Sequence, residues 1–178
     1  FGHNGSGKTT LLRILLGLSR PSGGQVLLDG AVPNAKVWKA FRNQCGFMPE
    51  RISFYEHLTG EETLRYFARL RGVDAEAATG VLERVGLLEA ARRQIGTYSK
   101  GMCQRLNLGQ ALLGDPEVLI MDEPIEGLDP RGVRDFFELL QQGRLHTVVL
   151  TSHRLSEVCP RVDRVCILDG GAVRALGS

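Results

Sequence analysis

Short apolar runs alternate along this chain with longer segments in which apolar residues recur every three or four positions. The short runs have the length and composition of strands, and the longer segments have the spacing of helices. Strands are expected at 25–28, 45–48, 118–121, 147–150 and 165–168, the last three of them buried. Because strands alternate with helices, the sequence predicts an α/β fold with a mostly parallel sheet at its core.

One long stretch, residues 59–113, is almost wholly helical in pattern. It opens with Thr59 and Glu62, which are spaced as a capping box. Further helices are expected at 74–85 and 99–113 within this stretch. Outside it we expect a helix from Pro130 and a buried helix that begins near Lys8, carries the leucines of 11–18 and is stopped by Gly17 and Pro21. We therefore expect residues 1–178 to form a single domain in which 59–113 is an inserted α-helical subdomain.

Composition and charge narrow the range of partners. The chain has 22 basic and 20 acidic residues, so its net charge of +2 provides no strong field for nucleic acid or anionic lipid. No apolar run approaches the roughly 20 residues that a membrane-spanning helix needs, so a role at a membrane requires a partner. The four cysteines show no metal-ligand spacing.

A glycine-rich loop at the start of the chain carries the first chemical signal. Residues 2–9 match the phosphate-loop pattern G-x-x-x-x-G-K-[ST], whose backbone N–H groups surround a phosphate at the N-terminus of a helix. The residues expected to contact a triphosphate are Gly2, His3, Asn4, Gly5, Ser6, Gly7, Lys8, Thr9 and Thr10. Lys8 is expected to reach the β- and γ-phosphates, and the Thr9 hydroxyl to ligate Mg²⁺. Only Phe1 precedes the loop, so we interpret the chain as an N-terminally truncated fragment of a longer protein.

A second signal is the pair of carboxylates that ends the apolar run 118–121. At the carboxyl end of a parallel strand, Asp122 would face the phosphate loop and could hold Mg²⁺. Glu123 follows directly and is placed to polarise a water for attack on the γ-phosphate. His153 follows the strand at 147–150, at the same edge of the sheet, and we expect it to contact the γ-phosphate.

A third signal lies at the start of the helix expected at 99–113. Ser99 can cap that helix, and Gly101 permits close approach of the backbone to a ligand. The N-terminus of this helix could therefore receive a second phosphate. The same two residues also satisfy the requirements of a plain helix cap, and both readings stay open on these residues alone.

Taken together, the order of these motifs, with Gly127-Leu128-Asp129, resembles the ATP-binding subunit of ABC transporters over nearly the whole chain. The resemblance implies a P-loop NTPase that binds ATP and Mg²⁺ and hydrolyses ATP. It implies that a second such domain, a second copy of this chain, packs head to tail, and that Ser99 and Gly101 contact the partner's ATP. It implies that Asp129 joins the two active sites and that His153 is the switch histidine.

The same resemblance implies a transmembrane permease as partner, no nucleic acid, and a location on the cytoplasmic face of the cell membrane. Two segments depart from the family pattern. Residues 98–102, the signature segment, keep the serine and the second glycine but read Tyr-Ser-Lys-Gly-Met. Where the family carries a glutamine near Mg²⁺, this chain has Glu50, which can ligate the metal but cannot donate a hydrogen bond.

A narrower resemblance is carried by Phe47-Met48-Pro49-Glu50, by residues 64–70 and by Thr97 with the signature segment. These look like the ATPase subunit of the copper-processing ABC system of nitrous-oxide reductase maturation. Two alternatives remain open. One is a soluble ABC-type ATPase acting on ribosomes or DNA, although the sequence shows neither a long coiled coil nor a charged linker. The other is a nucleotide-binding regulatory module that does not hydrolyse ATP.

Overall fold

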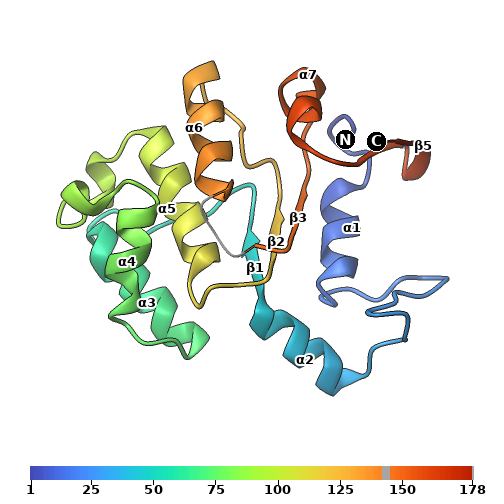
Figure 1. Ribbon diagram of the computed structural model, residues 1–178, viewed down its shortest axis with the longest axis horizontal. Helices are drawn as coiled ribbons and strands as arrows, with labels where there is room; N and C mark the ends of the chain where they lie inside the picture. The colour runs from blue at the N-terminus through green and yellow to red at the C-terminus, as the bar shows by residue number, and fades with distance from the viewer. Residues whose placement is uncertain (142–144, 178) are drawn as a thin grey trace.

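The computed structural model describes residues 1–141 and 145–177, and the elements follow one another as helices around short strands (Figure 1). The helices are α1 Lys8–Leu15, α2 Ala35–Gln44, α3 Gly60–Arg71, α4 Ala77–Arg84, α5 Lys100–Leu112, α6 Pro130–Gln141 and α7 Leu155–Val158. Single 3₁₀ turns lie at Leu88–Ala90, Ile95–Thr97 and Cys159–Arg161. The strands are β1 Cys45–Met48, β2 Val118–Met121, β3 Thr147–Leu150, β4 Val165–Asp169 and β5 Ala172–Gly177.

A three-stranded parallel sheet in the order β1-β2-β3 forms the centre of the molecule. Its register is even, because Cys45 pairs with Val118 and Val118 with Thr147, so the three strands start and end at the same level. The residues that follow the strands are consequently brought to one edge. The predicted α/β class, the parallel sheet and the bounds of these three strands are confirmed.

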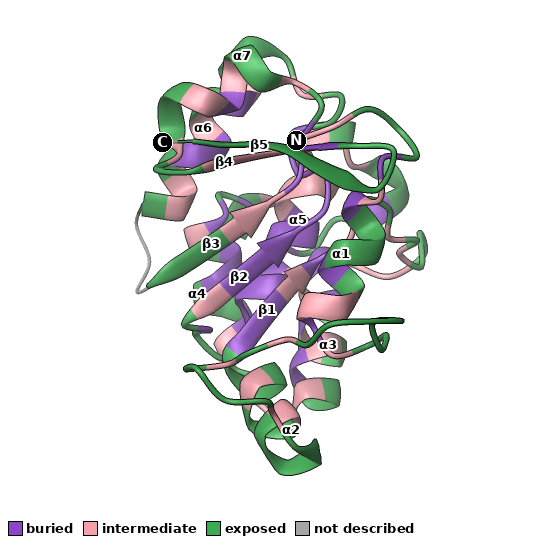
Figure 2. Ribbon diagram, turned by 90° about the vertical axis from the view of Figure 1, so that its right-hand side faces the viewer, coloured by how far each residue is buried: buried purple, intermediate pink, exposed green. Residues whose placement is uncertain are grey.

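The central strand β2 buries both of its faces, as Figure 2 shows for the described residues. Side chains alternate along a strand, so Leu119 and Met121 join the large core that includes residues of α3–α6. Ile120 points the other way and packs with Leu12 and Leu16 at the α1 face. The phosphate loop, which leads into α1, and the helical stretch that contains α5 therefore lie on opposite faces of the sheet.

The helical stretch begins as predicted and packs closely on the sheet. Thr59 and Glu62 form the capping box of α3, and Ser99 caps α5 by accepting a hydrogen bond from Met102 N. At Gly46 the backbone of β1 approaches α5 so closely that an added Cβ would lie 2.2 Å from the Ala111 carbonyl oxygen. Glycine is therefore required there by close approach of two backbones rather than by an unusual dihedral angle.

We expect Gly46→Ala to lower the free energy of unfolding by about 1–3 kcal/mol, because the new methyl group must push β1 away from α5. The matched control is Gly80→Ala, since Gly80 is exposed within α4 and an added Cβ there meets nothing within 4 Å. That variant should instead gain about 0.5–1 kcal/mol of stability from helix propensity. Urea unfolding of both variants measures the two changes, and equal stabilities would contradict this packing.

Three strand predictions need correction. Residues 25–28 form no strand and make only an isolated bridge between Leu28 and Ala31, because no strand of the described chain pairs with them. Strand β3 lies where predicted, but Thr147 and Val148 are exposed. Among the described residues β3 is hydrogen-bonded to a strand on one side, β2, and forms an edge of the sheet. Strand β4 pairs antiparallel with β5 outside the parallel sheet, and only its Leu168 is buried.

The helix predictions also differ in detail. The first helix is not buried all round: Leu12 and Leu16 face the sheet, whereas Leu11 and Leu18 are exposed. The helix expected from residue 74 begins at Ala77. Helix α2 was not predicted, although Asn34 caps it by accepting hydrogen bonds from Lys36 N and Val37 N. None of its residues is fully buried, but Trp38 and Phe41 lie on one side of it, with their rings in edge-to-face contact, and Phe41 packs against the smaller core cluster.

Candidate nucleotide-binding site

The phosphate loop turns back on itself and opens toward the N-terminus of α1. Gly5 and Gly7 have φ of 83° and 98°, a region that glycine enters without strain. Gly7 is the N-cap residue of α1 and no side chain caps the helix, so the N–H groups of its first turn are available to an anion. Ser6 lies inward, and its buried hydroxyl has no hydrogen-bond partner in the part of the chain that the structure describes.

Lys8 is 7% exposed, and its ammonium group lies over the loop rather than in solvent. Its Nζ donates hydrogen bonds to the carbonyl oxygens of Gly2 (2.7 Å) and His3 (3.2 Å). Nζ also lies 3.2 Å from Glu123 Oε1. The two groups form an ion pair, although their angles do not meet the requirement for a hydrogen bond. This arrangement holds the one buried cation of the loop beside the carboxylate that follows β2.

Asp122 occupies the centre of a chain of short hydrogen bonds at the carboxyl edge of the sheet. Thr9 Oγ1 donates to its Oδ2 (2.6 Å), and Thr151 Oγ1 donates to its Oδ1 (2.5 Å). Hydroxyl and carboxylate oxygens are the hard donors that Mg²⁺ prefers, and this cation takes only one or two protein carboxylates beside phosphates and water. The oxygens of Thr9 and Asp122 therefore have the chemistry that a magnesium ion requires, and their role as its ligands stays a prediction.

Glu123 is buried and held at both its backbone and its carboxylate. Its φ of 47° is unusual for a residue other than glycine. Its N–H donates to Thr151 Oγ1 (2.9 Å), and its Oε2 lies 3.0 Å from His153 Nδ1. His153 thus reaches the candidate catalytic carboxylate, and the structure brings the predicted Lys8, Glu123 and His153 together.

A cavity of about 300 Å³ lies between these groups, at the mouth of the phosphate loop. It is lined by Asn4, Gly5, Gly7, Lys8, Thr9, Thr10, Glu50, Arg51, Asp122, Glu123, Glu126 and His153. Of the predicted loop residues, Gly2, His3 and Ser6 do not line it. Glu50 does, but it is exposed and pairs with its neighbour Arg51 at 3.4 Å. Sequence reasoning missed Arg51, a cation that offsets the added charge of Glu50.

The β4–β5 hairpin supports the phosphate loop from outside. Gly171 N donates to the Ser6 carbonyl oxygen (3.2 Å), and His3 Nε2 lies 3.0 Å from Asp169 Oδ1. His3 Nδ1 also lies 2.7 Å from the Asn4 carbonyl oxygen. The Asn4 contact, followed by the Asp169 carboxylate, raises the pKa of the exposed His3 above its ordinary value, because both ring nitrogens donate only in the protonated form.

Polar side chains of α5 hold the backbone on either side of the cavity, a feature that sequence reasoning missed. Asn107 Nδ2 donates to the Pro49 carbonyl oxygen (2.9 Å), and Gln110 Nε2 to that of Phe47 (2.8 Å). Gln104 Nε2 donates to the Pro124 carbonyl oxygen (2.5 Å). The three residues recur at i, i+3 and i+6, a polar stripe on a buried helix face that could have marked them.

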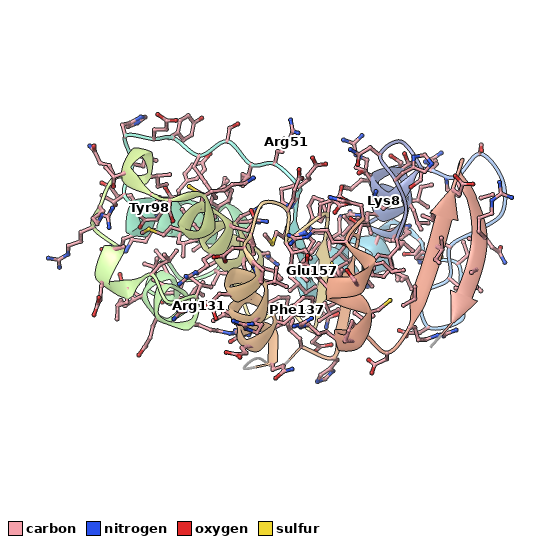
Figure 3. The ribbon with its side chains drawn as sticks, turned by 90° about the horizontal axis from the view of Figure 1, so that it is seen from above. Lys8, Arg51, Tyr98, Arg131, Phe137 and Glu157 are labelled. Carbon is pink, nitrogen blue, oxygen red and sulfur yellow. The ribbon has the colours of Figure 1, made fainter. Side chains whose placement is uncertain are left out.

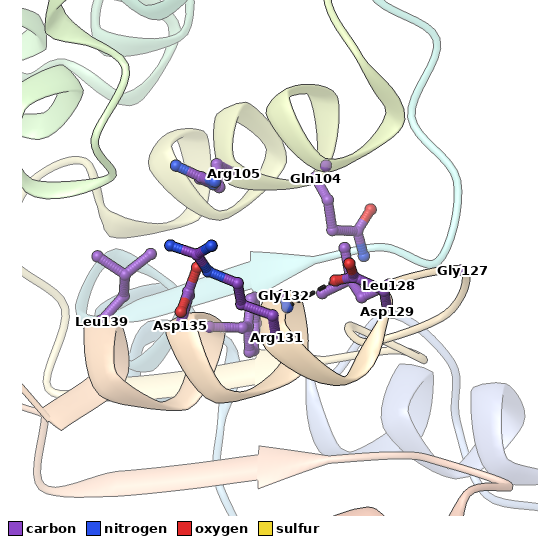
Figure 4. A pocket seen from close by; sticks show the side chains of 11 residues that line it. Gln104, Arg105, Gly127, Leu128, Asp129, Arg131, Gly132, Asp135 and Leu139 are labelled. Carbon is purple, nitrogen blue, oxygen red and sulfur yellow. Dashed lines mark hydrogen bonds between the residues drawn. The ribbon is translucent and has the colours of Figure 1, made fainter.

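The remaining predicted residues lie elsewhere. In Figure 3, Lys8 and Tyr98 lie toward opposite sides of the molecule, so the signature segment is far from the phosphate loop of its own chain. Gly101 and Asp129 line a second cavity of about 430 Å³. Figure 4 shows it between α5, which carries Gln104 and Arg105, and α6, which carries Arg131 and Asp135. Asp129 caps α6 by accepting a hydrogen bond from Gly132 N.

A parallel sheet flanked by helices, with a phosphate loop leading into α1 and two carboxylates at the end of β2, defines a P-loop α/β domain. The chain belongs to the ABC transporter family, whose model matches residues 1–126. Within residues 1–141 and 145–177, no helix combines the length and hydropathy needed to cross a membrane.

Similar proteins extend this result over the whole chain. The uncharacterised ABC transporter ATP-binding protein YdbJ of Bacillus subtilis is 41% identical over 98% of this chain and 58% of its own length. The bacitracin transport ATP-binding protein BcrA of Bacillus licheniformis is 41% identical over 96% of this chain and 56% of its own length. A solved ATP-binding subunit of an ABC transporter superposes with a TM-score of 0.80 at 30% identity, covering 100% of this chain and 76% of that structure. The chain therefore spans somewhat more than half the length of the curated relatives that it matches.

Proposed function

We propose that this chain is the ATP-binding and ATP-hydrolysing subunit of an ABC transporter. The observation that carries the proposal is the cavity at the phosphate loop, which gathers a buried lysine, two buried carboxylates and a histidine around one volume. Phosphoryl transfer requires mainly positioning and electrostatic stabilisation from a protein, and this cavity supplies both. A regulatory module without hydrolysis would have no need of Glu123 beside His153.

Each side chain has a distinct role in this proposal. Lys8 and the N–H groups of the loop bind the triphosphate, and Glu123 accepts a proton from the attacking water. His153 orients the Glu123 carboxylate, which it contacts at 3.0 Å, and reaches the γ-phosphate. Thr9, Asp122 and Glu50 would hold Mg²⁺, which would supply positive charge to offset the negative charge of the phosphates.

We infer further that two copies of the chain act together. Tyr98, which directly precedes Ser99, lies toward the opposite side of the molecule from Lys8 (Figure 3), so Ser99 and Gly101 would serve the nucleotide of a second copy packed head to tail. Asp129 would lie between the two sites. In this proposal 1–178 is one ATP-binding domain, 59–113 is its helical subdomain, and the assembly sits on the cytoplasmic face of the membrane beneath a transmembrane permease.

The test is light scattering on the Glu123→Gln chain, with and without Mg-ATP, alone and combined with Ser99→Asp. We expect Mg-ATP to convert Glu123→Gln from monomer to dimer. Ser99→Asp should prevent this while leaving ATP bound to the monomer, because aspartate preserves the cap of α5 but repels a partner's triphosphate.

The matched control is Ser22→Asp in an exposed loop, which should dimerise like the parent. A chain that binds Mg-ATP but stays monomeric without the Ser99 change would contradict the two-copy arrangement. Normal dimerisation of Ser99→Asp would remove Ser99 from the partner's site.

A narrower proposal concerns the cargo: the partner permease would move a copper- or sulfur-linked species for maturation of nitrous-oxide reductase. Its support is the sequence of residues 47–50, 64–70 and 97–102. Among the described residues no cluster of three or more His, Cys, Asp or Glu could hold a metal, so the cargo would be handled by the partner. The relatives' own names include bacitracin transport and linearmycin resistance. Normal copper loading of the reductase in a deletion strain would exclude the copper role.

A further inference from the structure

One hydroxyl group connects the two acidic residues of the site. Thr151 follows β3 directly and is 7% exposed. Its Oγ1 donates its single hydrogen to Asp122 Oδ1 (2.5 Å) and accepts the N–H of Glu123 (2.9 Å). Asp122 and Glu123 are adjacent in sequence, and both are hydrogen-bonded to this one oxygen. The Thr151 oxygen therefore sets the position of the Asp122 carboxylate relative to the Glu123 backbone.

The backbone of Glu123 gives this contact its importance. With φ at 47°, Glu123 occupies a region in which a residue other than glycine persists only where its surroundings hold it. Its N–H is buried, and a buried N–H without an acceptor is costly. Thr151 Oγ1 is that acceptor, so the hydroxyl supports the conformation that presents the Glu123 carboxylate to the cavity.

The end of β3 holds Glu123 from two directions. Thr151 and His153 both lie in the segment that follows β3, and both contact Glu123. Thr151 holds the backbone N–H of Glu123, whereas His153 Nδ1 and its backbone N–H reach Glu123 Oε2 at 3.0 and 3.3 Å. Removing the hydroxyl would leave the carboxylate contacts in place but free the backbone beneath them.

We propose that Thr151 is a positioning residue for ATP hydrolysis, which holds Asp122 and Glu123 in fixed relation across the β2–β3 edge of the sheet. This inference rests on the proposed function of the same site. It assigns to Thr151 an effect on turnover and on the Mg²⁺ requirement, because its two partners are the candidate metal ligand and the candidate base. It assigns no direct contact with the nucleotide, since Thr151 does not line the cavity.

The test compares Thr151→Val, which removes the hydroxyl at nearly constant volume, with Thr151→Ser, which keeps it. We expect Thr151→Val to lower kcat about tenfold and to raise the Mg²⁺ concentration for half-maximal activity several-fold, with KM for ATP changed less than about threefold. Thr151→Ser should restore kcat to within about threefold of wild type. The matched control is Thr147→Val, the same substitution at the exposed start of the same strand, which should behave as wild type.

A second measurement needs no turnover. A fluorescent ATP analogue is titrated into each variant in EDTA and then in Mg²⁺; Thr151→Val should match wild type in EDTA and lose part of the gain in affinity that Mg²⁺ brings. If Thr151→Val does not fold, Thr151→Ser is compared with Thr151→Cys, which differs in one atom and hydrogen-bonds weakly. In that pair kcat should be lower for cysteine.

Several outcomes overturn the proposal. The first is that Thr151→Val stays within twofold of Thr147→Val in kcat and in its dependence on Mg²⁺. The second is that Thr151→Ser loses as much kcat as Thr151→Val. The third, for the fallback pair, is that Thr151→Ser and Thr151→Cys have equal kcat. The proposed function fails separately. A folded wild-type chain without ATP turnover counts against that function and with it against this inference, whereas turnover that ignores Thr151 counts against this inference alone.

Discussion

Glu123→Gln is expected to abolish nearly all ATP turnover, lowering kcat by about 10²- to 10⁴-fold, the usual contribution of a positioned general base. The substitution preserves shape, and an amide oxygen can still accept the His153 contacts that now reach Oε2. It removes the ability to take a proton from water. Because the Lys8 contacts to the loop carbonyls do not involve Glu123, ATP binding should persist.

The measurement is steady-state phosphate release, paired with equilibrium binding of Mg-ATP to the same preparation. Glu138→Gln is the matched control, since Glu138 is exposed on α6 and does not line the cavity. Turnover in Glu123→Gln equal to that of the control would remove Glu123 from the catalytic role. Loss of binding together with turnover would assign Glu123 to the phosphate site instead.

Lys8→Ala should weaken triphosphate binding about 10- to 100-fold, the loss expected when hydrogen bonds to a charged group are removed. In the structure the Lys8 ammonium is already desolvated and held by two loop carbonyls and the Glu123 carboxylate. A triphosphate would offer it a stronger anionic partner at the same place. The substitution removes that cation and leaves the buried Glu123 with His153 as its remaining partner.

Isothermal titration with Mg-ATP measures the change, and thermal unfolding of the same sample checks that the loop change has not unfolded the chain. Lys39→Ala on the exposed face of α2 serves as control and should bind like wild type. Unchanged affinity in Lys8→Ala would mean that the phosphates are held by the loop N–H groups without the lysine.

Much of the site follows from local sequence. The phosphate loop, the start of α1 at Lys8 and the caps at Thr59 and Ser99 depend on residues within a few positions of one another, so short-range spacing predicts them. Strand β2 was equally predictable, because a strand buried on both faces is continuously apolar. Glu123 and Asp122 could be recognised since they end that strand.

The strand predictions that the structure corrects were wrong for a common reason. Residues 25–28 and β4 have similar strand patterns, but a strand exists only where another segment offers its hydrogen bonds, and the distribution of partners is a property of the whole fold. The exposure of β3 depends likewise on what covers its outer edge. Helix α2 is different, because its local signals were present and were overlooked: Asn34 can cap it, and Trp38 and Phe41 follow at helical spacing.

The sequence by itself determined which chemical groups this protein carries and which elements bear them, because motif spacing and side-chain periodicity are encoded locally. Only the tertiary structure decided how those groups meet. The even register of three parallel strands brings Thr151 and His153 beside Glu123, and the separation of Lys8 from Tyr98 places the signature segment away from its own loop. Contacts between residues far apart in the chain depend on packing, and no local pattern records them.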